Sequence, residues 1–216
     1  MKLIFPILFL LSLIFSSDQI PAADQDHLIL IKGGTIHTVS HGIFGNADIL
    51  FDNGKIISLG HELTVPAETA MIDAAGQHVF PGLISAVSTL GLQEIGAVRA
   101  TRDYAEVGDI NPNVRANVSY NPDSELIPIS RSNGILLALS VPRSGLVSGM
   151  SSLMMLDGWT WEDATIKHPG GLNLNWPNMR INYNPNAKKK EKEQIKLILG
   201  DGVKKIQPNE YITINS

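Results

Sequence analysis

The sequence predicts an α/β protein in which a β-rich part comes first and a strand, helix and strand follow it. Three observations indicate this order. Residues 27–80 consist of short β-branched and apolar runs separated by glycine and asparagine. After a Pro-Gly break, the largely apolar run at 83–87 is typical of a strand buried on both faces. A helix start at 121–125 then precedes a second buried strand at 135–141.

Composition and charge set several classes of function aside. A hydrophobic content of 44% with 18% charged residues is ordinary for a globular protein with a sizeable core. The formal net charge of -4 offers no basic surface for phosphates, so we expect no nucleic-acid partner. Because the chain has no cysteine, it has no disulfide framework, thiol nucleophile or lipoprotein anchor.

Residues 1–22 have the plan of a signal peptide. One lysine precedes an apolar run at 3–15, and small and polar residues follow that run. The run is shorter than the about 20 residues of a bilayer span, which disfavours an uncleaved anchor. We expect cleavage after Ala22, with Ser16 or Ser17 as the alternative. The mature chain is then exported to the periplasm and has no membrane segment.

The clearest local signal in the β-rich part is a hairpin. Strands at 47–51 and 55–59 flank Asn53 and Gly54, the pair that most readily supplies the positive φ angles of a two-residue turn. A second strand, turn and strand over 71–80 repeats this plan. The other expected strands are 28–31, ended by Gly33 and Gly34, and 35–39, with a turn bracketed by Gly42 and Gly45.

Three segments in a fixed order lead into the apolar strand: K-G-G-T-I, then A-D-I-L-F-D-N-G-K-I-I-S-L-G, then I-D-A-A-G-Q-H-V-F-P-G-L-I. Over residues 28–92 this order resembles amidohydrolases of the imidazolonepropionase and dihydroorotase-like kind. The resemblance implies a small β-sandwich part at 23–80, which the C-terminal tail completes, and the first repeats of an incomplete (β/α) barrel at 81–181. An unrelated all-β exported domain is the alternative.

The strand after the break also departs from that family. The family commonly reads P-G-L-I-D-x-H-x-H here, and the two histidines bind the catalytic metal, typically zinc or another divalent ion. In this chain Ser85 replaces the aspartate, while Val87 and Thr89 replace the histidines. Val87 has no donor atom, and a hydroxyl such as that of Thr89 is a poor ligand at neutral pH. We therefore predict no metal cofactor for this chain.

Other chemistries have weaker support. The six histidines are at positions 27, 37, 41, 61, 78 and 168. We expect His37 and His41 on the surface beside a turn, and His168 to stand alone. No G-x-S-x-G elbow, phosphate loop or dinucleotide fingerprint occurs, which argues against serine catalysis and nucleotide binding.

The stretch at 142–163 is the most function-like part of the second half. It follows the strand at 135–141, and α/β barrels build their sites at the carboxyl ends of strands. Arg143, Ser148 and Trp159 are the predicted pocket residues, whereas 153–156 is expected to be core. The pocket would take a small-molecule substrate or ligand.

The length and the ligand pattern lead to two functional hypotheses. The residues from 81 onward are too few for a complete eight-stranded barrel of about 250 residues, so we expect a fragment or truncated product, ending in a linker and charged helix at 182–216. The first hypothesis is an amidohydrolase-family hydrolase of non-peptide carbon-nitrogen bonds by descent, inactive alone. The alternative is an exported, non-catalytic binding or assembly subunit that pairs with a partner chain or with itself.

Overall fold

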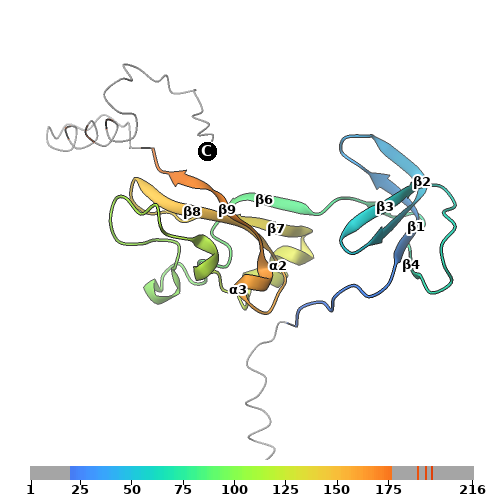
Figure 1. Cartoon of the computed structure of the whole chain (residues 1–216), viewed down its shortest axis with the longest axis horizontal. Helices are drawn as coiled ribbons and strands as arrows, with labels where there is room; N and C mark the ends of the chain where they lie inside the picture. The colour runs from blue at the N-terminus through green and yellow to red at the C-terminus, as the bar shows by residue number, and fades with distance from the viewer. Residues whose placement is uncertain (1–19, 177–188, 190–192, 194–195, 197–216) are drawn as a thin grey trace, which may run out of the picture.

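The computed structural model describes residues 20–176 and the single positions 189, 193 and 196. Two sheets organise this part of the chain, and Figure 1 shows them as separate lobes joined by the segment that leads into strand β6. The predicted signal peptide at 1–22 and the predicted linker and helix at 182–216 lie almost entirely outside the described residues. No helix in the described part is long and apolar enough to cross a membrane.

Sheet A and sheet B follow one another along the chain. Sheet A contains β1 (Ile29–His37), β2 (Ile43–Asp52), β3 (Lys55–Gly60), β4 (Ala70–Asp73) and β5 (His78–Val79). Sheet B contains β6 (Leu83–Ser88), β7 (Ile135–Ser140), β8 (Val147–Met155) and β9 (Thr165–Leu174). The short helices are the 3-10 turns η1 (Arg99–Thr101) and η2 (Ala116–Ser119), and α2 (Leu126–Ser132) and α3 (Trp161–Ala164). Mixed sheets and few helices fit the predicted α/β class.

The predicted hairpin of sheet A is confirmed. Strands β2 and β3 pair in antiparallel fashion around Asn53 and Gly54, which have φ angles of 47° and 71°. Strand β2 begins earlier than expected, at Ile43, so Gly45 lies within a strand and not at a turn. The turn that precedes β2 contains Gly42, at a φ of 86°.

The two strands predicted at 28–31 and 35–39 are instead one strand, β1. The register with β2 shifts between Ile31 and Gly34, which marks an irregularity at the glycine pair. Gly33 has a φ of 70°, and its N–H donates to the Asp48 carboxylate at 2.9 Å. The glycines therefore bend β1 without ending it, because a side chain from β2 satisfies the displaced amide.

Strands β4 and β5 also correct the prediction, since they do not pair with each other as a hairpin. Both run parallel to β1, β4 beside its first half and β5 beside its second half. Gly76, at a φ of 72°, lies in the turn between them. The sheet order is β3-β2-β1-β4, with β5 also on β1. One side of this sheet buries Ile36, Ala47 and Ile49 against Phe44, Phe51, Leu59 and Val79.

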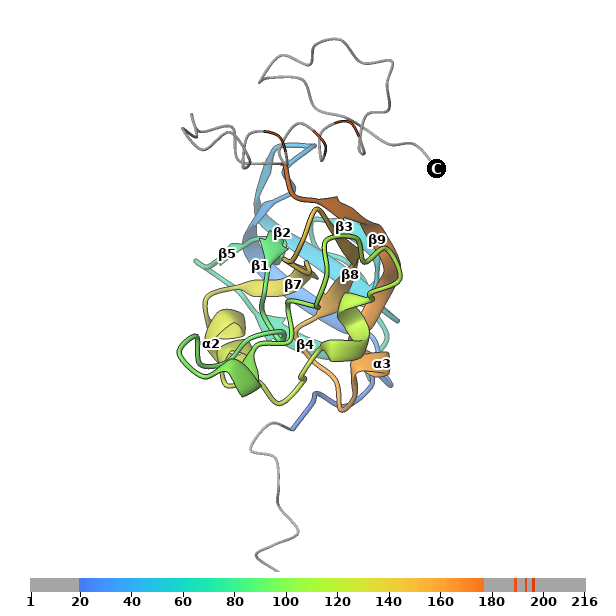
Figure 2. The ribbon, with the colours of Figure 1, turned by 90° about the vertical axis from the view of Figure 1, so that its left-hand side faces the viewer.

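Sheet B begins as predicted. The order is β6-β7-β8-β9, and β6 and β7 are parallel. The connection between them includes the expected irregular stretch and the expected helix, α2, which Asn133 caps and after which Gly134 adopts a φ of 82°. Figure 2 shows the green segment that follows β6 passing across sheet B. Isolated bridges from Ile110 to Val147 and from Arg115 to Met150 attach it to β8.

The stretch at 142–163, in which the predicted pocket residues lie, contains a long strand. Residues Val147–Met155 form β8, which pairs antiparallel with β7 and with β9. The connection at 141–146 is too short for the crossover of a dozen or more residues that a further parallel strand would need. Sheet B is therefore mixed, and the described residues do not form a barrel.

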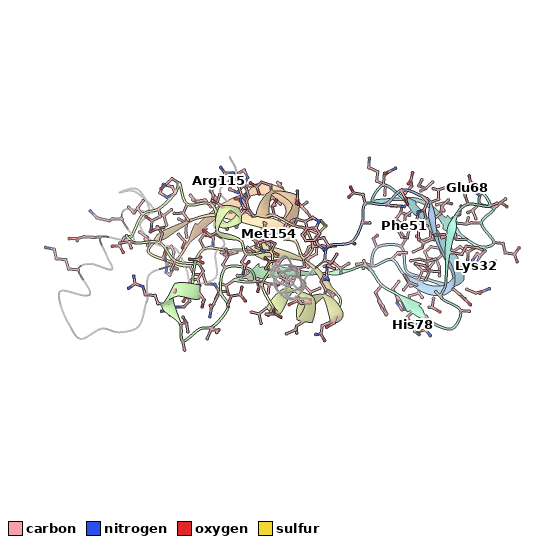
Figure 3. All side chains as sticks on the ribbon, turned by 90° about the horizontal axis from the view of Figure 1, so that it is seen from below. Lys32, Phe51, Glu68, His78, Arg115 and Met154 are labelled. Carbon is pink, nitrogen blue, oxygen red and sulfur yellow. The ribbon has the colours of Figure 1, made fainter. Side chains whose placement is uncertain are left out.

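Strand β6 was expected to be buried on both faces, and it is not. It is the edge strand of sheet B, and Leu83, Ile84 and Val87 are 59%, 58% and 63% exposed. The core lies further inside the sheet, where Tyr120, Ile127, Ala138, Met154, Leu156 and Ala164 form one buried cluster. The predicted core assignment of 153–156 is confirmed for Met154 and Leu156, which are fully buried. Figure 3 shows Met154 inside this lobe.

Candidate functional site

The end of β6 carries no metal-binding geometry. Val87 is exposed and has no donor atom, and Thr89 lies in a turn where its carbonyl accepts from the Leu92 N–H at 2.9 Å. The Ser88 hydroxyl accepts from the Leu90 N–H at 3.0 Å and so closes the same turn. No group of three or more His, Asp or Glu residues in the described part could hold a metal ion. The described residues at the end of β6 therefore show no three-ligand arrangement of this kind.

Of the three predicted pocket residues, Ser148 lies on β8, Arg143 precedes the strand and Trp159 follows it. Arg143 is exposed, and its backbone N–H donates to the Tyr104 carbonyl at 2.6 Å. Ser148 is fully buried near the start of β8, and its hydroxyl accepts from Asn175 Nδ2 at 2.8 Å. Trp159 follows the other end of β8 and is 61% exposed. Because a strand rises by about 3.3 Å per residue, the structure does not bring Ser148 and Trp159 together.

A polar cluster that the sequence did not predict joins β8 to β9. His168 Nδ1 lies 2.8 Å from the Ser152 hydroxyl, and Arg115 Nε donates to His168 Nε2 at 3.1 Å. The expectation that His168 stands alone was therefore wrong. Ser152 is fully buried, whereas Arg115 is exposed at the surface of the lobe (Figure 3).

The hydrogen bonds of this cluster fix the proton on His168. A guanidinium can only donate, so Nε2 of His168 accepts and Nδ1 carries the hydrogen of the neutral ring. That hydrogen points to the Ser152 oxygen, which also accepts from the Asn117 N–H at 3.2 Å. In this arrangement His168 cannot remove the Ser152 proton. The cluster resembles a serine-histidine pair in composition but holds strands together instead of activating a nucleophile.

Partial burial, and secondly the positive charge of Arg115, lower the pKa of His168 from its ordinary value of 6.5. The unfolded chain then takes up a proton at this residue before the folded chain does, so stability is lost as the pH falls below about 6.5. We expect the wild-type chain to lose more thermal stability between about pH 7.5 and pH 5 than His168→Asn, whose amide can still donate to Ser152. Thermal unfolding at several pH values measures this difference, and equal pH slopes for the two proteins would contradict it.

The chain was compared with protein families, with curated proteins and with solved structures. No family model matches the chain. A dihydroorotase of Geobacter sulfurreducens is 50% identical over 56 residues, which are 26% of this chain and 13% of the enzyme. A dihydroorotase of Syntrophus aciditrophicus is 31% identical over 84 residues, 37% of this chain and 20% of the enzyme. A crystal structure of an amidohydrolase from Thermotoga maritima matches with a TM-score of 0.64 and 28% identity.

The N-terminal part of the chain is related to the amidohydrolase superfamily. The Thermotoga amidohydrolase match covers 76% of this chain and 42% of that protein. Sheet A, at 29–79, is less than a quarter of the chain, so the likeness to an amidohydrolase extends into sheet B. The α/β fold with a β-sandwich part is thus supported by a solved amidohydrolase. The chain spans only about an eighth of the first dihydroorotases it matches.

The sequence analysis missed the Arg115, Ser152 and His168 cluster, whereas its assignment of Val87 and Thr89 to the positions of the family's histidines stays a prediction. The P-G-L-I motif fixes the position of the strand, so the residues that follow it can be read directly. The polar cluster instead depends on the register of β8 against β9, in which Leu153 pairs with Lys167.

Proposed function

We propose that this chain provides the N-terminal scaffold of a hydrolase of the amidohydrolase type, whose class acts on carbon-nitrogen bonds other than peptide bonds. In this proposal β6, α2 and β7 are the first repeat of a (β/α) barrel, and the described residues do not catalyse the reaction by themselves. The observation that carries the proposal is the order of sheet A, then β6, within a chain that matches the Thermotoga amidohydrolase over 76% of its length.

The residues at the end of β6 support one part of the proposal, namely that the described residues do not catalyse the reaction by themselves. A metal-bound hydroxide needs a metal that lowers the pKa of water to about 7, and two neutral imidazoles usually help to hold it. Val87 and Thr89 supply no such ligands. The comparisons favour hydrolase descent over the alternative of a binding or assembly subunit, because the relatives named above are dihydroorotases and an amidohydrolase.

The proposal is tested with zinc and with a substrate of the relatives. We expect the purified full-length chain and the double variant V87A/T89A to have the same zinc affinity in equilibrium dialysis, since neither side chain is a good ligand. We also expect no hydrolysis of dihydroorotate above the uncatalysed rate, with or without added zinc.

Two results would overturn the proposal in different ways. A loss of zinc affinity in V87A/T89A would mean that the end of β6 holds a metal. The second result is hydrolysis of dihydroorotate by the wild-type chain in a metal-dependent reaction whose rate per molecule is constant across purification steps. That result would mean that the residues present are sufficient for catalysis. Circular dichroism of both proteins controls for loss of fold.

A further inference from the structure

Two histidines far apart in the sequence lie side by side on sheet A. His37 ends β1, and His78 begins β5, the parallel strand beside it. The register pairs Thr35 with His78, so His37 and His78 are two residues apart along one face of the sheet. His37 Nε2 and His78 Nδ1 are 3.0 Å apart. Figure 3 shows His78 at the periphery of the lobe that contains sheet A.

A third ring packs against this pair. Phe80 stacks on His37 with ring centroids 4.1 Å apart and an angle of 15° between the ring planes. Phe80 is 64% exposed, so its stacking does not bury the pair in a core. It limits the rotation of the His37 ring, and the contact between His37 and His78 is exposed.

We propose that His37 Nε2 and His78 Nδ1 chelate a divalent transition-metal ion. Neutral imidazole is a good ligand for copper, nickel and zinc. In the metal-free pair one ring donates a proton to the nitrogen of the other. When the ion binds, that ring becomes the tautomer with its proton on the outer nitrogen, so both facing nitrogens supply lone pairs. This site lies on sheet A, away from the end of β6, and does not depend on the proposed hydrolase function.

The distance between the two nitrogens selects among ions. With metal-nitrogen bonds of about 2.0–2.1 Å, a 3.0 Å separation corresponds to an angle of roughly 91–97° at the metal. Square-planar and octahedral ions require about 90° between neighbouring ligands, whereas tetrahedral zinc requires about 109°. The geometry therefore suits Cu²⁺ and Ni²⁺ better than Zn²⁺.

The test uses the untagged full-length chain and Ni²⁺ as the probe in isothermal titration calorimetry. His37→Gln and His78→Gln should each weaken Ni²⁺ binding by at least about ten-fold, because even changes outside a ligand set cost about 10–100-fold. His41→Gln is the matched control, since His41 is an exposed histidine on the neighbouring turn whose Nδ1 contacts Ser40. This control should bind Ni²⁺ as the wild type does, and the wild type should bind Ni²⁺ more tightly than Zn²⁺.

A second measurement needs no variant. Paramagnetic Cu²⁺ at substoichiometric concentration should broaden the ring resonances of His37 and His78 in NMR spectra before those of the other four histidines. Equal Ni²⁺ affinity in His37→Gln, His78→Gln and the control, or first broadening at His27 or His41, would overturn the proposal. If both histidines are required but the wild type binds Zn²⁺ more tightly than Ni²⁺, the inference that the nitrogen-metal-nitrogen angle selects the ion is wrong.

Discussion

Replacing Met154 with alanine is expected to lower the free energy of unfolding by about 2–5 kcal/mol, the range for removing a buried Met, Leu or Ile side chain. Met154 lies on β8, is fully buried, and belongs to the cluster with Tyr120 and Ile127. The cluster also contains Ala138 of β7 and Ala164 of α3. The cavity left by the truncation would therefore weaken the packing of α2 and α3 against sheet B. Urea unfolding followed by circular dichroism measures the change.

Met155 provides the matched control, because it is the next residue of β8 and its side chain points to the other face of the strand. It is 38% exposed, so Met155→Ala removes less buried surface. We expect a loss of no more than about 1 kcal/mol for this variant. Equal losses for the two variants would mean that β8 does not separate a buried face from a more exposed one in solution.

Local turn chemistry made part of the fold predictable. The hairpin at Asn53 and Gly54 follows from two residues whose positive φ angles are favourable in that order. The end of α2 at Asn133 and Gly134 follows for a similar reason. The parallel pairing of β6 and β7 could be expected because a long connection with a helix separates two apolar runs.

Features that depend on partners distant in sequence were not predictable in the same way. The glycine pair in β1 looked like a strand end, because nothing near it in sequence reveals that the Asp48 carboxylate receives the Gly33 N–H. Strand β8 was not among the predicted strands, and its residues are small and polar as well as apolar. Serine side chains at positions 148, 151 and 152 are nevertheless buried there, since strands on both sides satisfy the backbone and other polar groups satisfy the hydroxyls.

The candidate sites differ in the same way: one could be predicted from a local motif, and the other depends on contacts between residues distant in sequence. The prediction that Val87 and Thr89 replace metal ligands rests on a motif in one short stretch. By contrast, the His37 and His78 pair requires the knowledge that β5 runs parallel to β1 with Thr35 opposite His78. The predicted second hairpin over 71–80 would have placed His78 against β4, so the error in topology concealed the histidine pair.

Replacing Asp48 with alanine is expected to lower the free energy of unfolding by about 2–3 kcal/mol, because two backbone donors lose a buried acceptor. Asp48 is 3% exposed, and its two carboxylate oxygens accept from the Gly33 N–H at 2.9 Å and the Leu63 N–H at 3.0 Å. These bonds connect the irregular point of β1 to the segment after β3. Thermal and urea unfolding of the variant measure the loss.

Asp73 allows this prediction to be separated from a general effect of removing a carboxylate. Its Oδ1 accepts from the Ala75 N–H at 3.0 Å, but the residue is exposed, so water can replace the acceptor. We therefore expect Asp73→Ala to change the free energy of unfolding by only about 0.5 kcal/mol. Asp48→Asn should fall between the two variants, because its amide keeps one acceptor oxygen but turns an NH₂ group toward the second backbone N–H. A loss in Asp48→Ala no larger than that in Asp73→Ala would mean that the glycine irregularity holds its shape without the carboxylate, and that β1 needs another explanation for its continuity.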